Sequence, residues 1–154
     1  MEIVDTTNYL SLDNNNILSD SEIRGMNLFF SEKTNCSSCH ADFNFTNYAF
    51  ENNGLYEDYA DLGRFRLTNN ENDRARFKVP TLRNIELTAP YMHDGSIKSL
   101  EAVILHYESG GKNQPNKSEL IQPIILTDAE RNDLILFLKT LTDETFINNS
   151  LLKK

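Results

Sequence analysis

Apolar residues recur at helical intervals in three separate segments of the chain. The first segment opens with Ser19 and Glu22, which have the spacing of a capping box, in which each side chain hydrogen-bonds the backbone of the other residue. Ile23, Met26 and Phe30 then follow along one helical face. This pattern predicts a helix that buries these three side chains.

The first predicted helix also contains Gly25. Glycine destabilises a helix interior by about 1 kcal/mol relative to alanine, so its presence there calls for a packing reason. A residue without a side chain lets a neighbouring backbone come close. Gly25 therefore predicts the point at which a second helix crosses the first.

Two later segments have the same helical character. One begins at Ser99 and ends before the pair Gly110-Gly111, which is typical of a helix C-terminus. The other opens with Thr127 and Glu130, a second capping box. The apolar positions are Leu100, Val103, Ile104 and Tyr107 in the earlier segment and Leu134, Phe137, Leu138 and Leu141 in the later one. We expect a helix with a buried face in each segment.

The rest of the chain has no sustained hydrophobic period. Residues 42–76 are rich in Asn, Asp, Gly and aromatic side chains, which is typical of a long functional loop. The sequence therefore predicts an all-α fold with long irregular loops, in one domain that covers residues 18–146. We expect residues 1–17, which are polar and Asn-rich, to be disordered or linker-like, and residues 147–154 to form a C-terminal tail.

The composition excludes some classes of protein. The hydrophobic fraction is 39% and the mean hydropathy is −0.50, and no stretch approaches the roughly 20 apolar residues that cross a bilayer. The net charge of −8 disfavours non-specific nucleic-acid binding and suits a partner with a basic face. Residues 1–16 contain no basic segment followed by an apolar run, so they show no export signal.

The strongest chemical signal is Cys36-Ser37-Ser38-Cys39-His40, which holds both cysteines of the chain. Two thiols at this spacing can each add to one vinyl group of a porphyrin, and the adjacent His40 can ligate the iron. A structural disulfide would account for the two cysteines only. A zinc site would need two more ligands, and a thioredoxin-like pair would need a βαβ context. The motif predicts one covalent haem c and hence a small c-type cytochrome fold. Because haem c is normally attached outside the cytoplasm, we expect a periplasmic or otherwise exported protein. Either these 154 residues are a mature or truncated form, of which we favour the truncated one, or the export signal lies upstream of Met1.

A long stretch after the haem motif resembles a known family. Residues 77–85 (Phe-Lys-Val-Pro-Thr-Leu-Arg-Asn-Ile) and 87–95 (Leu-Thr-Ala-Pro-Tyr-Met-His-Asp-Gly) are similar to the C-terminal haem domain of the bacterial dihaem cytochrome c peroxidase / MauG family. The resemblance extends over residues 18–146. It implies an oxidoreductase with two haem domains, in which an N-terminal domain reacts with hydrogen peroxide and a C-terminal domain relays electrons to it.

With one haem motif, the chain matches the electron-relaying domain, and the peroxidatic domain would lie outside these 154 residues. The resemblance implies a small cytochrome or cupredoxin as the electron donor. The alternative is a free-standing monohaem cytochrome that only carries electrons. Coordination of the iron bears on the choice, because a sixth ligand from the protein blocks direct reaction with peroxide.

Several residues compete for the sixth iron position. Met92 is a natural thioether ligand, and a His/Met pair raises the reduction potential. The resemblance instead implies Tyr107, because the family ligand lies on the helix that follows the motif and MauG has a tyrosine there. The position could also be filled by His93 or His106, or stay open. We expect His93 to lie near the haem in a hydrogen-bonding role and His106 to face solvent.

Further residues are candidates for contacts around the haem. The guanidinium fork of Arg83 matches a haem propionate, and Arg64 is a second candidate for that contact. The resemblance also implies that the backbone carbonyls of Thr88 and Pro90 contribute to a calcium site between two haem domains, as suits a hard cation. That site would be incomplete without the other domain.

Overall fold

The computed structural model describes residues 18–151, so the predicted N-terminal segment 1–17 and the last residues of the predicted tail, 152–154, lie outside the described residues. The helices are α2 (Asp20–Phe29), α3 (Phe65–Thr68), α4 (Leu100–Glu108), α5 (Asp128–Lys139) and α6 (Glu144–Asn148). Single 3-10 turns occur at η1 (Cys36–Ser38), η2 (Glu71–Asp73) and η3 (Ile85–Leu87), and two short strands at β1 (Phe50–Glu51) and β2 (Phe77–Lys78).

The three predicted helices are present as α2, α4 and α5, and the capping boxes expected for α2 and α5 are formed. The Ser19 backbone amide donates to the Glu22 carboxylate at 2.7 Å, which completes the capping box of α2. Thr127 and Glu130 form the equivalent box of α5. Each cap satisfies backbone amides that have no partner within the helix, so these residues fix where the two helices begin.

The crossing of α2 and α5 occurs at Gly25, as predicted. A Cβ atom at Gly25 would lie 2.0 Å from the carbonyl oxygen of Asp133, so only glycine allows this contact. The expected apolar stripe of α2 is wrong in part, because Ile23 is 39% and Phe30 is 42% exposed. The close crossing turns the Gly25 and Phe29 face inward instead, and both residues are buried.

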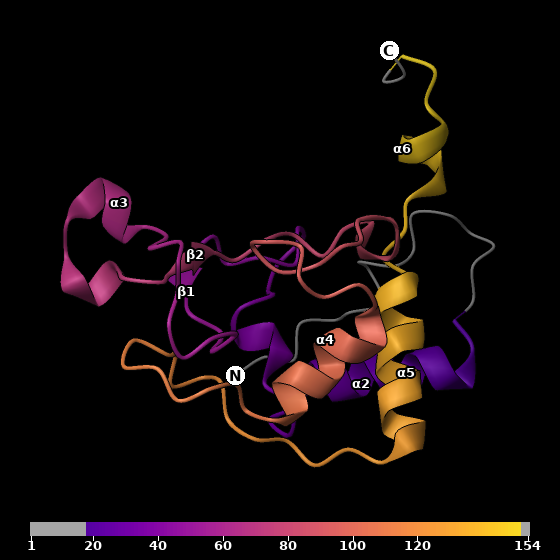
Figure 1. Cartoon of the computed structure of the whole chain (residues 1–154). Helices are drawn as coiled ribbons and strands as arrows, with labels where there is room; N and C mark the ends of the chain where they lie inside the picture. Colours follow the sequence, from indigo (N-terminus) through magenta and orange to yellow (C-terminus); the bar gives the residue numbers. More distant parts are fainter. Residues whose placement is uncertain (1–17, 152–154) are drawn as a thin grey trace.

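The core lies where α2, α4 and α5 meet the loop that follows the haem motif. Phe29 contacts Phe45 and Phe137 at ring-centroid distances of 5.9 and 5.2 Å. The stripe predicted for the last helical segment is confirmed, since its four side chains are 6% exposed or less: Leu134, Phe137, Leu138 and Leu141. Figure 1 shows these three helices gathered on one side, with the long loops opposite them and α6 extending away.

The long loop region contains a little strand. β1 and β2 pair antiparallel, with Phe50 opposite Lys78 and Glu51 opposite Phe77, so the all-α expectation is met only in part. The pairing fixes the ends of the loop that carries α3.

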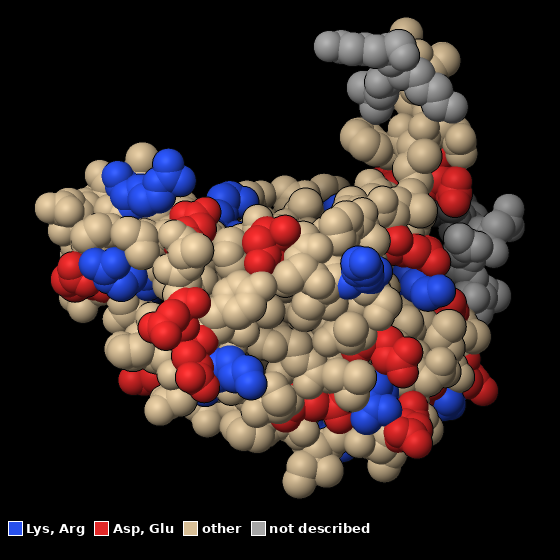
Figure 2. All heavy atoms as spheres, in the orientation of Figure 1, with Lys and Arg blue, Asp and Glu red and all other residues tan. Residues whose placement is uncertain are grey.

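None of the helices within residues 18–151 is long and apolar enough to cross a membrane. Figure 2 shows basic and acidic side chains interspersed over the same face of the molecule.

Candidate haem site

The Cys-Ser-Ser-Cys-His segment is folded into a tight turn. η1 spans Cys36–Ser38, and the backbone amides of Cys39 and His40 both donate to the carbonyl of Cys36, at 3.3 and 3.0 Å. The turn brings both thiols and the imidazole to the wall of one cavity. Both cysteines are free and half-buried. Burial raises the pKa of each thiol, that of Cys39 to about 11, so both are neutral thiols at pH 7.

His40 is oriented by a hydrogen bond to the backbone. Its Nδ1 lies 3.1 Å from the carbonyl oxygen of Phe45, and because a carbonyl can only accept, Nδ1 carries the proton. The other ring nitrogen, Nε2, therefore keeps its lone pair. Burial lowers the pKa of His40, which favours this neutral form. A neutral imidazole with a backbone-bound N–H is the form in which histidine ligates metals.

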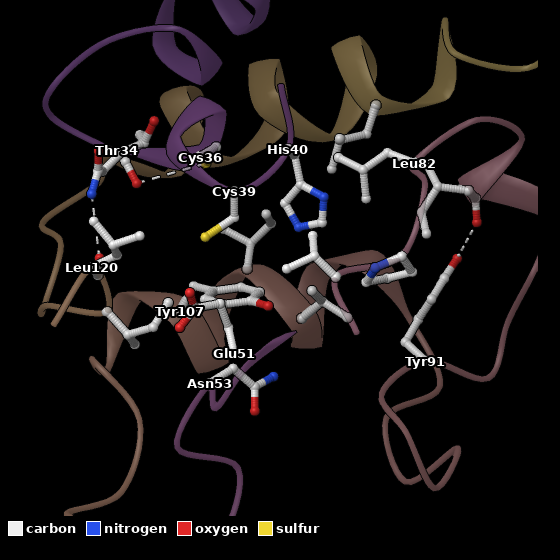
Figure 3. A pocket seen from close by; sticks show the side chains of 18 of the residues that line it. Thr34, Cys36, Cys39, His40, Glu51, Asn53, Leu82, Tyr91, Tyr107 and Leu120 are labelled. Carbon is white, nitrogen blue, oxygen red and sulfur yellow. Dashed lines mark hydrogen bonds between the residues drawn. The ribbon is translucent and has the colours of Figure 1, made fainter. Parts of the chain in front are cut away.

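The cavity beside this turn has a volume of about 330 Å³ and is lined mostly by apolar side chains. They come from α2, α4, α5 and the loop around Val79 and Pro80. Figure 3 shows Cys39 and His40 on one wall and Tyr107 of α4 on the opposite wall. Free thiols, a neutral histidine and apolar walls fit a covalently attached haem, which needs two thioether bonds, an axial nitrogen and a dry pocket.

A comparison with protein-family models agrees with this geometry. Residues 23–142 match the sequence model of the cytochrome c family. The chain belongs to the cytochrome c family. A cytochrome c domain carries covalent haem c, so the chemistry expected from the cysteine motif is that of its family.

Individual relatives place this cytochrome c domain more narrowly. It is 42% identical over 123 residues to the methylamine utilization protein MauG of Methylorubrum extorquens, covering 79% of this chain and 34% of that protein. It is 37% identical over 133 residues to cytochrome c551 peroxidase of Nitrosomonas europaea, covering 84% of this chain and 36% of that protein. The chain thus spans about a third of the length of these curated relatives.

A solved structure supports the same relation. A MauG-like protein associated with microbial copper homeostasis matches with a TM-score of 0.83 and 38% identity, over 88% of this chain and 47% of that one. The dihaem peroxidase BthA of Burkholderia thailandensis, at a TM-score of 0.65 and 22% identity, shares the fold. The expected relation to the dihaem peroxidase and MauG proteins is therefore confirmed.

The cytochrome c domain brings most of the predicted site residues together. Those that line the cavity are Cys36, Cys39, His40, Met92, His93 and Tyr107. Burial raises the pKa of the Tyr107 phenol, and the neighbouring Asn53 side chain opposes this rise. His93 stacks on Phe77 with ring centroids 3.8 Å apart.

The remaining predicted site residues lie elsewhere. Arg83 donates through Nε and Nη2 to the carbonyl of Phe43, at 3.0 and 2.6 Å, and it lies outside the set of residues that line the cavity. Thr88 and Pro90 are on the exposed loop after η3 and also do not line it. Arg64 pairs with Asp73 at 3.5 Å. Among the described residues that line the cavity, Lys78 is the one lysine or arginine.

One expectation about α4 is wrong. His106 does not simply face solvent, because it is half-buried and its Nε2 lies 3.0 Å from the carbonyl oxygen of Asn53. Burial lowers its pKa. Asn53 itself was not predicted, although it lines the cavity, because it lies in a polar, Asn-rich loop without periodicity. Its contacts are with Met92 and with α4, and no local pattern reports such distant pairings.

Proposed function

We propose that this chain is the electron-transfer haem domain of a dihaem cytochrome c peroxidase-like oxidoreductase. It would relay single electrons to a peroxidatic haem in a domain outside this chain. The observation that carries the proposal is the cavity, which offers iron-ligating side chains from opposite walls, His40 on one and Tyr107 on the other. Haem held between two protein ligands supplies a one-electron redox couple and has no position left for peroxide.

Each lining residue has a part in this proposal. Cys36 and Cys39 would form the thioether bonds, and His40 would ligate through Nε2. Tyr107 would provide the sixth ligand, with Met92 as the alternative. A phenolate oxygen lowers the reduction potential, whereas a thioether raises it, so the choice between them sets the driving force of the relay. Arg83 stays a candidate partner for a haem propionate, and Lys78, which lines the cavity, would be a second one.

The length of the relatives favours a relay over a free-standing carrier. MauG and the cytochrome c551 peroxidase are each about three times as long as the part that this chain matches. The proposal therefore includes hydrogen peroxide as the final oxidant, a small cytochrome or cupredoxin as donor, and an exported location. The carbonyls of Thr88 and Pro90 would take part in calcium binding only together with ligands from the other domain.

The optical and EPR spectra of the haem-loaded ferric chain test this function. We expect a low-spin spectrum that hydrogen peroxide leaves unchanged, because both axial positions are filled by the protein. A high-spin spectrum that peroxide converts rapidly would show that this domain reacts with peroxide by itself, and it would overturn the assignment as a relay. His40→Ala should abolish the low-spin signal, which ties the spectrum to the proposed ligand.

A further inference from the structure

Glu51 places a carboxylate at the wall of the haem cavity. It is the second residue of β1, and its pairing with Phe77 of β2 fixes its backbone beside another residue that lines the cavity. Among the described residues that line the cavity, Glu51 is the one aspartate or glutamate. Figure 3 shows its side chain at the wall, on the side of Tyr107. An acidic group thus lies in a pocket whose walls are otherwise mostly apolar.

The charge of this carboxylate is not cancelled by an ion pair. Within residues 18–151, none of the ion pairs between side chains includes Glu51. The neighbouring cation at the cavity, Lys78, is engaged elsewhere, because its Nζ lies 3.3 Å from the carbonyl oxygen of Val79 and 5.0 Å from the centre of the Tyr48 ring. Glu51 is also half-buried, so solvent screens its charge less than that of a surface carboxylate.

The field of this carboxylate reaches the haem attachment motif. Burial raises the pKa of the Cys39 thiol to about 11, and the negative charge of Glu51 adds to that rise. Cys39 directly follows η1 and Glu51 ends β1, so the fold brings the two side chains to one cavity. The sulfur of Cys39 would be bonded to the porphyrin. Glu51 therefore acts electrostatically at the position that the haem would take.

A negative charge at this position favours one oxidation state of the iron. Ferric haem carries one positive charge more than ferrous haem, so a nearby anion stabilises the ferric form and lowers the reduction potential. The effect is larger at a half-buried site than at the surface, because dielectric screening is weaker there. Its direction is the same with Tyr107 or Met92 as the sixth ligand, since it depends on the charge of Glu51 and not on the ligand.

We propose that Glu51 is a redox-tuning residue whose carboxylate lowers the reduction potential of the haem held in this cavity. This inference rests on the haem site of the proposed function. It deepens that function, because a lower potential gives the haem more driving force to pass an electron to a partner haem. A partly screened unit charge should change the ferrous-to-ferric ratio at a fixed potential by about 3- to 10-fold, which corresponds to roughly 30–60 mV for one electron.

The experiment is a spectroelectrochemical redox titration of haem-loaded chains at neutral pH. Glu51→Gln keeps the shape of the side chain without its charge, and it should raise the midpoint potential by roughly 30–60 mV. Glu51→Asp keeps the charge and should stay close to the original value. Glu57→Gln is the matched control, with the same charge change at an exposed residue that does not line the cavity, and it should have little effect. Glu51→Ala serves as the second uncharged variant if Glu51→Gln does not load haem.

Equal midpoint potentials of the original chain and Glu51→Gln would overturn the proposal. Equal shifts in Glu51→Gln and Glu57→Gln would also overturn it, because the cause would then be the net charge of the chain. A shift in Glu51→Asp as large as that in Glu51→Gln would assign the effect to side-chain shape, and a changed ferric spectrum of Glu51→Gln would assign it to altered axial ligation. Either result would contradict tuning by charge.

The relay is tested by a separate measurement. A peroxide-reactive high-spin spectrum of the unmodified chain would overturn the relay function, whereas the difference in potential between Glu51 and its uncharged variant would still be measurable. The failure of the relay and the failure of redox tuning by Glu51 are therefore distinguishable.

Discussion

Single residues in this domain are prepared for haem chemistry by burial and by backbone contacts. His40 is kept neutral by burial, and the carbonyl of Phe45 settles which ring nitrogen carries its proton. The thiols of Cys36 and Cys39 are likewise neutral, because burial raises the pKa of each.

Gly25 provides a test at the scale of one residue. Gly25→Ala should lower the free energy of unfolding by about 2 kcal/mol, because overpacking outweighs the gain of about 1 kcal/mol in helix propensity. The new Cβ would lie 2.0 Å from the Asp133 carbonyl oxygen and 2.9 Å from Cβ of Phe137. Urea unfolding of the two proteins measures the difference. Asn27→Ala, at an exposed position of the same helix, should be neutral or slightly stabilising. An equally stable Gly25→Ala protein would show that the helices separate without cost.

The sequence was sufficient to predict the roles of residues that depend only on their immediate neighbours in the chain. The Cys-Ser-Ser-Cys-His motif needs only a tight turn, and the glycine of α2 signals a crossing by its own lack of a side chain. Asn53, His106 and Arg83 are different, because their roles depend on partners 39 or more residues away. A hydrogen bond of that kind has no periodic signature, so those contacts became visible only in the fold.

At the scale of helices and strands, the ends were easier to predict than the buried faces. The capping boxes of α2 and α5 are local, and both helices begin where the boxes place them. In α2, the predicted face with Ile23 and Phe30 lies next to the face with Gly25 and Phe29. Packing against α5 buries the second face. The strands β1 and β2, of two residues each, are too short to show an alternating pattern.

Asp133 and Arg24 give a test at this scale, because they join α5 to α2. Arg24 Nε donates to Asp133 Oδ2 at 2.7 Å, and the Asp133 side chain is 6% exposed. Asp133→Asn should lower the free energy of unfolding at pH 7 by about 1–2 kcal/mol, since a charge-assisted hydrogen bond is lost. Thermal or urea unfolding measures this. Asp128→Asn is the matched control, with the same charge change at a side chain that is 99% exposed, and should have little effect.

The stability difference between the original protein and Asp133→Asn depends on pH through the pKa of Asp133. The hydrogen bond from Arg24 holds this pKa below its usual value near 4, so the folded state binds the proton less readily than the unfolded state. The stabilisation is therefore complete above the unfolded pKa and is lost as the pH falls through the folded pKa. The difference in free energy of unfolding between the original protein and Asp133→Asn should be constant from about pH 5 to about pH 7. It should become smaller below about pH 4, as linkage predicts. A constant gap down to about pH 2.5 would refute this linkage.

For the whole molecule, the family relation and the charge bear on how electrons arrive and leave. The chain matches about a third of MauG. In the proposed function, one face of this domain would meet another haem domain and the rest would be open to electron donors. The net charge is −8, but Figure 2 shows both signs interspersed on the face in view. Steering by such a surface comes mainly from the net charge of the domain, which acts over the Debye length.

This argument predicts opposite salt effects for small redox probes of opposite charge. Reduced haem-loaded chain should be oxidised faster by the cation tris(phenanthroline)cobalt(III) at low salt, and more slowly as salt is added. Ferricyanide, an anion, should show the reverse. The range from about 10 mM to about 150 mM suits the measurement, since the Debye length falls from roughly 30 Å to roughly 8 Å. Stopped-flow absorbance gives both rates. Equal salt dependence of the two rates would show that a neutral surface around the haem edge governs access, and not the net charge. The net charge would then give no electrostatic reason to expect a donor with a basic face.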